Sequence, residues 1–241
     1  MRRILVPLIF VSLGLEPARP SAAAESDVNT FSIVAFDPAT GDLGVAVASK
    51  YFGVGSVVPW AKTGIGAVAT QARAKVAFGV EALQLLEAGK PAQETLDAVL
   101  ETESRRDLRQ LAIIDAKGAV AVHTGGQCHG WAGHRIGRHF SVQGNLLAAE
   151  EVVTAMAAAF ENARGAGTGE LAEWLVAALE AGQGAGGDKR GQQSAALLVV
   201  RANSGPSGDH DRYVDLRVED HRTPLAELTR LLAMHREFYG R

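Results

Sequence analysis

The N-terminal third of the chain alternates apolar runs with short polar turns. Two apolar runs, Phe31–Phe36 and Leu43–Ala48, flank a stretch at residues 37–42 that contains Asp, Pro and Gly. β-Prone runs on both sides of such a stretch predict a β-hairpin. Because nearly every position of both runs is apolar, we expect other parts of the protein to cover both faces of this hairpin.

Polar side chains stand where these apolar runs end. Ser49 and Lys50 follow the second run directly, and a third apolar run, Ile65–Ala69, ends at Thr70 and Gln71. The ends of strands and the loops beyond them are where a rigid scaffold usually holds binding and catalytic groups. The sequence therefore offers these four polar residues as candidate site residues.

Apolar residues at helical spacing predict five helices. Two apolar runs on either side of a turn, at 110–114 and 119–123, predict a second hairpin. The helices are expected from about Phe78 to Gly89, after Pro91, over 150–163, over 171–182 and around Leu225–Leu232. Further strands are expected over 110–114, 119–123 and 195–200, with a short strand over 140–147 that is broken at Gln143-Gly144-Asn145. Two hairpins in one domain predict two stacked antiparallel sheets or one large sheet. The charged run 101–109 is interpreted as a solvated connection.

The first residues have the composition of a secretory signal peptide. Two arginines precede an apolar stretch, Ile4–Leu15, and small residues at 21–24 offer a cleavage site. We therefore expect a signal peptide over residues 1–24, a spacer over 25–29 and a single domain over 30–241. No later apolar run reaches the length of a membrane helix. The expected protein is periplasmic or secreted, with no membrane contact after signal cleavage.

Composition narrows the classes of partner. The chain has 241 residues and a formal net charge of -3, which suits one domain and gives no reason to expect nucleic acid as a partner. Cys128 is the single cysteine, so no intramolecular disulfide is possible. No cofactor is predicted.

Thr30, at the head of the first hairpin, is the strongest candidate for a catalytic group. A Thr whose own α-amine is free can act as a nucleophile, with that amine as the general base. Signal cleavage alone would leave residues 25–29 in front of Thr30, so a second cut would be needed to free the amine. Alternatively, Thr30 is a β-branched residue that favours strand entry.

A Gly-rich stretch over residues 123–134 predicts a shaped binding loop. Cys128 and His134 are its candidate site-lining residues. The spacing of its Cys and His residues matches no zinc pattern, so no metal is predicted. Cys128 with a nearby His is an alternative nucleophile, although a lone cysteine is more often a small buried residue.

Two other polar stretches precede or interrupt apolar runs. Arg190 could bind a substrate carboxylate through its planar pair of donors, oriented by Asp188, with Gln193 close by. The alternative is an exposed ion pair in a linker. Asn145 beside Gly144 supplies an amide that could donate to an oxyanion, and equally suits a turn.

Several motifs together resemble a bacterial domain-of-unknown-function family, number 1028. They are TFSIVAFDPATGDLGVAVASK, GVGSVVPWAKTGIGAVATQ, C-x-x-WAGH, QGNLLA and GGDKRGQQSAALLVV. The family is grouped with the N-terminal nucleophile hydrolases, so the resemblance implies an α+β fold, a four-layer αββα sandwich of two stacked antiparallel sheets. It also implies that Thr30 begins the domain and that Ser49 lies near the position of a second hydroxyl beside the nucleophile. Lys50 next to it could lower the pKa of the nucleophile.

These inferences lead to one expected function and two alternatives. The expected function is hydrolysis of a small amide or peptide-like substrate by Thr30, with Ser49, Lys50 and Asn145 as further catalytic candidates. The alternatives are a non-catalytic binding protein on the same fold and a hydrolase that uses Cys128. The C-terminal apolar helix either caps the core or forms a homodimer contact.

Overall fold

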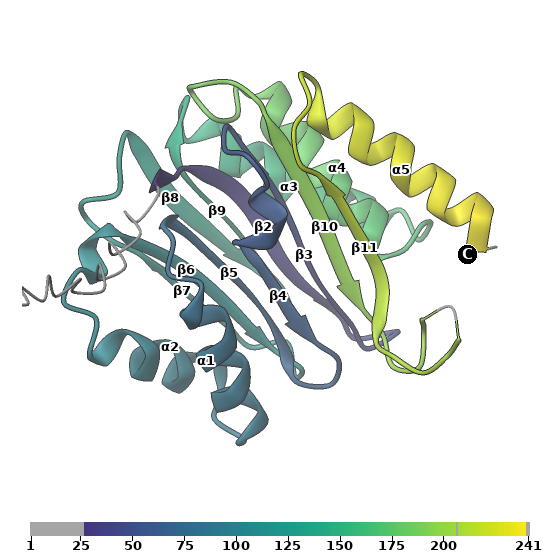
Figure 1. Ribbon diagram of the computed structural model, residues 1–241, viewed down its shortest axis with the longest axis horizontal. Coiled ribbons are helices and arrows are strands. Elements are labelled where there is room, and N and C mark those ends of the chain that lie inside the picture. Colours follow the sequence, from purple (N-terminus) through teal and green to yellow (C-terminus); the bar gives the residue numbers. More distant parts are fainter. Residues whose placement is uncertain (1–26, 206, 240–241) are drawn as a thin grey trace, which may run out of the picture.

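Two antiparallel β-sheets stack face to face and carry helices on both outer faces (Figure 1). The computed structural model describes residues 27–205 and 207–239. The predicted signal peptide and the first two residues of the predicted spacer, 25 and 26, lie outside these residues. The arrangement confirms the α+β fold with two stacked sheets and excludes one large sheet.

The larger sheet contains the first hairpin at its centre. Its strand order is β11-β10-β3-β2-β9-β8. The strands are β2 (Thr30–Asp37), β3 (Asp42–Ser49), β8 (Trp131–Gly137), β9 (Phe140–Leu147), β10 (Ser194–Val200) and β11 (Arg212–Val218).

The smaller sheet has the order β1-β5-β6-β7, and β4 also pairs with β5. Its strands are β1 (Asp27–Val28), β4 (Pro59–Lys62), β5 (Gly66–Arg73), β6 (Arg109–Asp115) and β7 (Val120–Thr124). β1 and β2 are consecutive in the chain but belong to different sheets. The chain therefore crosses from the smaller sheet to the larger one at Asn29.

The helices form the two outer layers. α1 (Ala77–Glu87) and α2 (Ala92–Glu101) cover the smaller sheet, while α3 (Glu151–Gly165), α4 (Leu171–Gly184) and α5 (Pro224–Tyr239) cover the larger one (Figure 1). Two short 3₁₀ turns, η1 (Val54–Ser56) and η2 (Arg106–Leu108), lie in the loops. No helix in the described part of the chain is both long and apolar enough to cross a membrane.

Side chains of β2 alternate between two of the three hydrophobic clusters. Phe31 and Ile33 point into the cluster under α3 and α4, while Val34 belongs to the cluster between the sheets. The third cluster lies between the smaller sheet and its own helices. The prediction that both faces of the hairpin are covered is therefore confirmed.

Two local predictions were wrong. β9 is continuous through Gly144, which pairs with Phe31, while Gln143 pairs with Ser32. Ladder pairing on both sides of β9 holds these residues in a strand instead of a turn. The charged run that ends at Arg109 is not fully solvated either, because Arg109 is 2% exposed and pairs with Glu103 at 3.2 Å.

Candidate active site

The open ends of β2 and β3 bring two buried hydroxyls together. Thr30 and Ser49 are partners in the antiparallel register, and their Oγ atoms lie 3.2 Å apart. Both side chains are almost completely buried. The pairing follows from the tight hairpin, because the turn at residues 38–41 fixes which residues face each other at the far end.

The carbonyl oxygen of Asn29, directly before Thr30, accepts two hydrogen bonds. Ser49 Oγ donates to it at 2.5 Å and Arg190 Nη2 at 2.9 Å. Thr30 Oγ1 itself donates to the carbonyl of Val28 at 2.8 Å. Donation by a hydroxyl and a guanidinium draws electron density from the Asn29 carbonyl, the change that makes an acyl carbon easier to attack.

Asp188 holds Arg190 in the orientation that this contact requires. Its two carboxylate oxygens accept from Arg190 Nε at 3.1 Å and Nη2 at 2.7 Å, and it also accepts from the backbone N of Lys50 at 3.0 Å. The Asp188 side chain is fully buried, while 32% of the Arg190 side chain is exposed. The predicted pairing of these two residues is present, and it directs the guanidinium at the carbonyl of Asn29.

The segment before Thr30 is part of the folded domain. In β1, Val28 pairs with Ala72 of β5, and Val28 has no exposed surface. Asn29 is 6% exposed. The peptide bond that joins Asn29 to Thr30 is therefore held where the chain passes between the two sheets.

A network of amide side chains occupies the space between the sheets, and Gln110 is its centre. Gln110 Oε1 accepts from Gln71 Nε2 at 2.7 Å and from Asn145 Nδ2 at 2.9 Å. Its Nε2 donates to the carbonyls of Gly133 at 3.1 Å and Gly144 at 2.9 Å, and to Thr124 Oγ1. Gln71 continues the network to Ser32, Gln143 and Ser141.

The network fixes which atom of Asn145 is free. Backbone carbonyls only accept hydrogen bonds, so Nε2 of Gln110 must face Gly133 and Gly144, and its Oε1 must face Asn145. One N–H of the Asn145 amide then donates to Gln110, and its buried Oδ1 has no hydrogen-bond partner among the described residues. Ser49 and Arg190 already donate to the carbonyl oxygen beside Thr30, so they suit an oxyanion role better than Asn145.

The other predicted site residues have separate contacts. Lys50 Nζ donates to Gln192 O at 3.2 Å, Thr70 Oγ1 to Lys75 O at 3.3 Å and Gln193 Nε2 to Asp220 Oδ1 at 3.0 Å. Lys50 and Gln193 line a cavity of about 650 Å³ together with Gln192 and residues 220–223. Thr70 and Gln71 are buried in β5, and only Gln71 reaches the amide network.

The side-chain hydrogen bonds of Cys128 and His134 go to partners other than Thr30. Cys128 Sγ donates to the Arg109 carbonyl at 3.5 Å, and burial raises the pKa of its thiol. His134 Nδ1 is 2.9 Å from Thr124 Oγ1; burial, followed by the charge of His123, lowers the pKa of His134. No group of three or more potential metal ligands occurs within residues 27–205 and 207–239.

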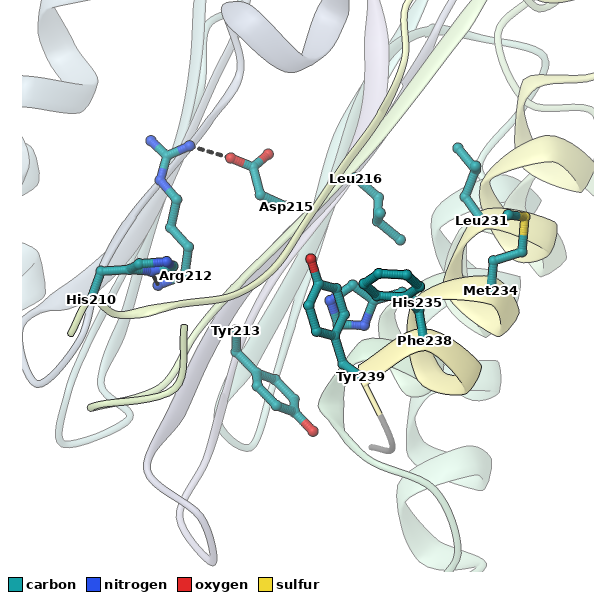
Figure 2. A pocket seen from close by; sticks show the side chains of 10 residues that line it. All are labelled: His210, Arg212, Tyr213, Asp215, Leu216, Leu231, Met234, His235, Phe238 and Tyr239. Atoms are coloured by element: carbon teal, nitrogen blue, oxygen red, sulfur yellow. Dashed lines mark hydrogen bonds and ion pairs between the residues drawn. The ribbon is translucent and has the colours of Figure 1, made fainter. Parts of the chain in front are cut away.

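Another cavity, of about 510 Å³, lies between β11 and the end of α5 (Figure 2). Its lining includes the apolar side chains of Leu216, Leu231, Met234 and Phe238, and Arg212 pairs with Asp215 among the lining residues. None of the residues that the sequence marked as site candidates lines this cavity. It is therefore separate from the arrangement around Thr30.

The fold and the site can be compared with known proteins. The model of a family of unknown function, DUF1028, matches residues 30–228. A crystal structure of protein SPO2555 from Silicibacter pomeroyi, described as DUF1028, is 33% identical and superposes with a TM-score of 0.76, over 86% of each chain. No curated protein matches this chain.

Proposed function

Because this chain belongs to DUF1028, a family of unknown function, membership assigns no reaction, and we propose one from the site itself. The protein is a hydrolase of amide bonds that uses Thr30 as its nucleophile. Cleavage of the peptide bond between Asn29 and Thr30 first releases the α-amine of Thr30. On the basis of the predicted signal peptide, this takes place after export to the periplasm or the medium.

One observation carries the proposal: the Asn29 carbonyl oxygen accepts from both Ser49 and Arg190, beside the hydroxyl of Thr30. A carbonyl in an ordinary connecting segment has no need of a buried hydroxyl and an oriented guanidinium. Two donors at an acyl oxygen are the arrangement that stabilises the negative charge of a tetrahedral intermediate. These contacts support the proposal that the peptide bond between Asn29 and Thr30 is the first substrate of the site.

Release of the Thr30 amine proceeds by an acyl shift from nitrogen to oxygen, followed by hydrolysis of the ester. Thr30 Oγ1 forms a bond to the Asn29 carbonyl carbon, and its proton passes through Ser49 Oγ to the carbonyl oxygen. The bond from that carbon to the Thr30 nitrogen then breaks, and the nitrogen takes up the proton. Water hydrolyses the resulting ester, which leaves a carboxylate on Asn29 and a free amine and hydroxyl on Thr30.

After release, the same groups act on a separate amide. The free amine of Thr30, with an ordinary pKa of about 7.7–8.0, accepts the proton of its own hydroxyl as it attacks. Ser49 and Arg190 then donate to the substrate oxyanion. Asp188 keeps Arg190 oriented and balances its charge, as the pair already does in the intact chain.

The test is the intact mass and N-terminal sequence of the protein expressed with its own leader. We expect wild type and Thr30→Ser to begin at residue 30. Thr30→Ala should retain the preceding residues, because it has no hydroxyl to attack. Ser141→Ala is the matched control, since Ser141 is a buried hydroxyl whose hydrogen-bond partner among residues 27–205 and 207–239 is Gln143 and not Thr30 or Asn29.

Two results would contradict the proposed function or its self-cleavage step. If wild type keeps residues before Thr30 during long storage, the amine stays blocked and the hydrolase proposal fails. The binding-protein hypothesis would then be favoured. If Thr30→Ala is cleaved at the same position as wild type, another protease makes the cut, and the self-cleavage step is wrong.

A further inference from the structure

The three residues before Thr30 are bound as an extended ligand would be. Val28 of β1 pairs with Ala72 of β5 in an antiparallel register, Val28 is completely buried, and the Asn29 carbonyl is held by Ser49 and Arg190. Backbone pairing along a sheet edge and a pocket for a side chain are contacts by which proteins recognise an extended peptide, and the donors at the Asn29 carbonyl add a polar contact at its end.

The edge of β5 has room for such a peptide at one place. β6 pairs with one edge of β5 over Gly66–Ala72, and β4 occupies the other edge over residues 66–69. β1 pairs at residues 72–73, beyond the end of β4. If β1 left after cleavage, Ala72 would lose its ladder partner Val28 and could pair with another strand, while the Arg73 carbonyl would keep its hydrogen bond from Arg109 Nη1.

The side chain of Val28 fills an apolar site between the sheets. It belongs to the buried cluster that includes Val47, Val54 and Val58, and it has no exposed surface. Interiors are packed so closely that a site vacated by a Val accepts a side chain of similar size and resists a much larger one. Departure of β1 would expose a site for a small branched apolar side chain.

We propose that Val28 and Asn29 occupy the acyl site of the enzyme, so that its substrates are extended peptide amides with a small branched apolar residue before the acylating residue. The inference rests on the proposed function. Self-cleavage forms an ester between the Asn29 acyl carbon and Thr30 Oγ1. The same ester forms when Thr30 Oγ1 of the released enzyme attacks the amide of a separate peptide, Asp-Val-Asn-NH-R, whose C–N bond breaks to release the amine, so the two acyl groups need the same site.

The first test needs no known substrate and uses the protein's own cleavage. Val28→Phe should slow release of Thr30 by at least about tenfold, and Val28→Ile by much less, because only Phe greatly exceeds the site. Residue 28 is removed by the cut, so the released enzyme is identical in every variant. Equal release rates for Val28→Phe and wild type would overturn the inference.

The second test uses the released enzyme and three coumarin amides, acetyl-Asp-Val-Asn, acetyl-Asp-Ala-Asn and acetyl-Asp-Phe-Asn. We expect kcat/KM to be highest for Val and about tenfold or more lower for Ala and for Phe. The free acid acetyl-Asp-Val-Asn should inhibit competitively, and the permuted peptide acetyl-Asn-Asp-Val should not.

The two proposals fail in different ways. A chain that never begins at Thr30 overturns the proposed function, and this inference with it. A chain that begins at Thr30, and neither binds acetyl-Asp-Val-Asn nor distinguishes the three amides, overturns only the inference. The mass of the protein separates these results before any substrate is added.

Discussion

Gln110 is the single residue on which the polar network between the sheets depends. Gln110→Leu has a similar volume but would leave Asn145, Gln71 and the carbonyl of Gly144 without their partner in a buried space. Each buried polar group left unsatisfied costs about 1–3 kcal/mol, so we expect a loss of about 3 kcal/mol in the free energy of unfolding. Urea denaturation measures this loss of stability.

The matched control is Gln93→Leu, on the exposed side of α2, where the Gln93 amide donates a hydrogen bond to Asp97. We expect a change within about 0.5 kcal/mol there. A Gln110→Leu protein as stable as this control would mean that the network is not needed to hold the two sheets.

Cys128 allows a test of the alternative hypothesis that its thiol is the nucleophile. Burial is the main cause that raises the pKa of its thiol, so the reactive thiolate is scarce at neutral pH. We expect iodoacetamide to modify Cys128 more slowly than a free cysteine, as followed by intact mass. We also expect fully alkylated protein and Cys128→Ser to retain hydrolysis, whereas loss of activity in both would revive the thiol mechanism.

At the scale of residues, the sequence predicts four side chains of the candidate site. It misses the centre of the amide network and one backbone atom beside Thr30. Thr30, Ser49, Asp188 and Arg190 were predicted, and the structure brings them together. Gln110 was missed because one polar residue in an apolar run gives no periodic signal. The Asn29 carbonyl was missed because a backbone atom leaves no trace in residue identity.

At the scale of elements, the contact between α1 and β4 depends on a glycine. A Cβ on Gly79 would collide with the indole of Trp60, which packs directly against α1. Gly79→Ala gains about 1 kcal/mol of helix propensity, but overpacking costs about 1–3 kcal/mol. We expect a net loss of up to about 2 kcal/mol in the free energy of unfolding, measured in thermal or urea unfolding.

Gly165, the last residue of α3, is the matched position, because a Cβ there meets no atom within 4 Å. Gly165→Ala should therefore stabilise the protein, by about 0.5 kcal/mol. If both variants are stabilised, helix propensity decides at both positions and the Trp60 contact is looser than the structure indicates.

The sequence predicted most strands inside the sheets and the edge strand β7, but it predicted a break in the interior strand β9 and missed the edge strands β4, β8 and β11. β2, β3, β5, β6 and β10 are buried on both faces, so their sequences are continuous apolar runs. The edge strands β4, β8 and β11 are partly exposed, and their sequences therefore mix polar and apolar residues. The pairing of an edge strand is decided by the neighbour it finds, which local sequence does not encode.

At the scale of the whole molecule, one ionic cluster joins the layers at the end opposite Ser49. Arg201, after β10, pairs with Asp42 at 2.6 Å and with Glu170 at 3.1 Å, and Tyr213 of β11 donates to Glu170 at 2.7 Å. Glu170 also caps α4. The cluster connects three strands of the larger sheet to a helix, although its members are far apart in sequence, and no local pattern predicts it.

The Glu170 carboxylate makes this connection sensitive to acid. Burial by itself raises the pKa of Glu170, but the hydrogen bond from Tyr213 and the charge of Arg201 outweigh it, so the pKa is lowered from 4.5. A carboxylate whose pKa is lower in the folded state stabilises the protein above pH 4.5, and the contribution is lost as the pH falls through the folded value. Because the side chain is 34% exposed, the contribution is at most about 1 kcal/mol.

Glu170→Gln keeps the size of the side chain and removes its charge, so the variant isolates the contribution of that charge to the free energy of unfolding. We expect the variant to be less stable than wild type at pH 7 and the difference to shrink between pH 4.5 and pH 3, in urea unfolding at each pH. Glu81→Gln, on the exposed face of α1, should give no such convergence. A Glu170→Gln difference that is constant from pH 7 to pH 3 would mean that shape and hydrogen bonding, and not charge, hold the end of α4 against the sheet.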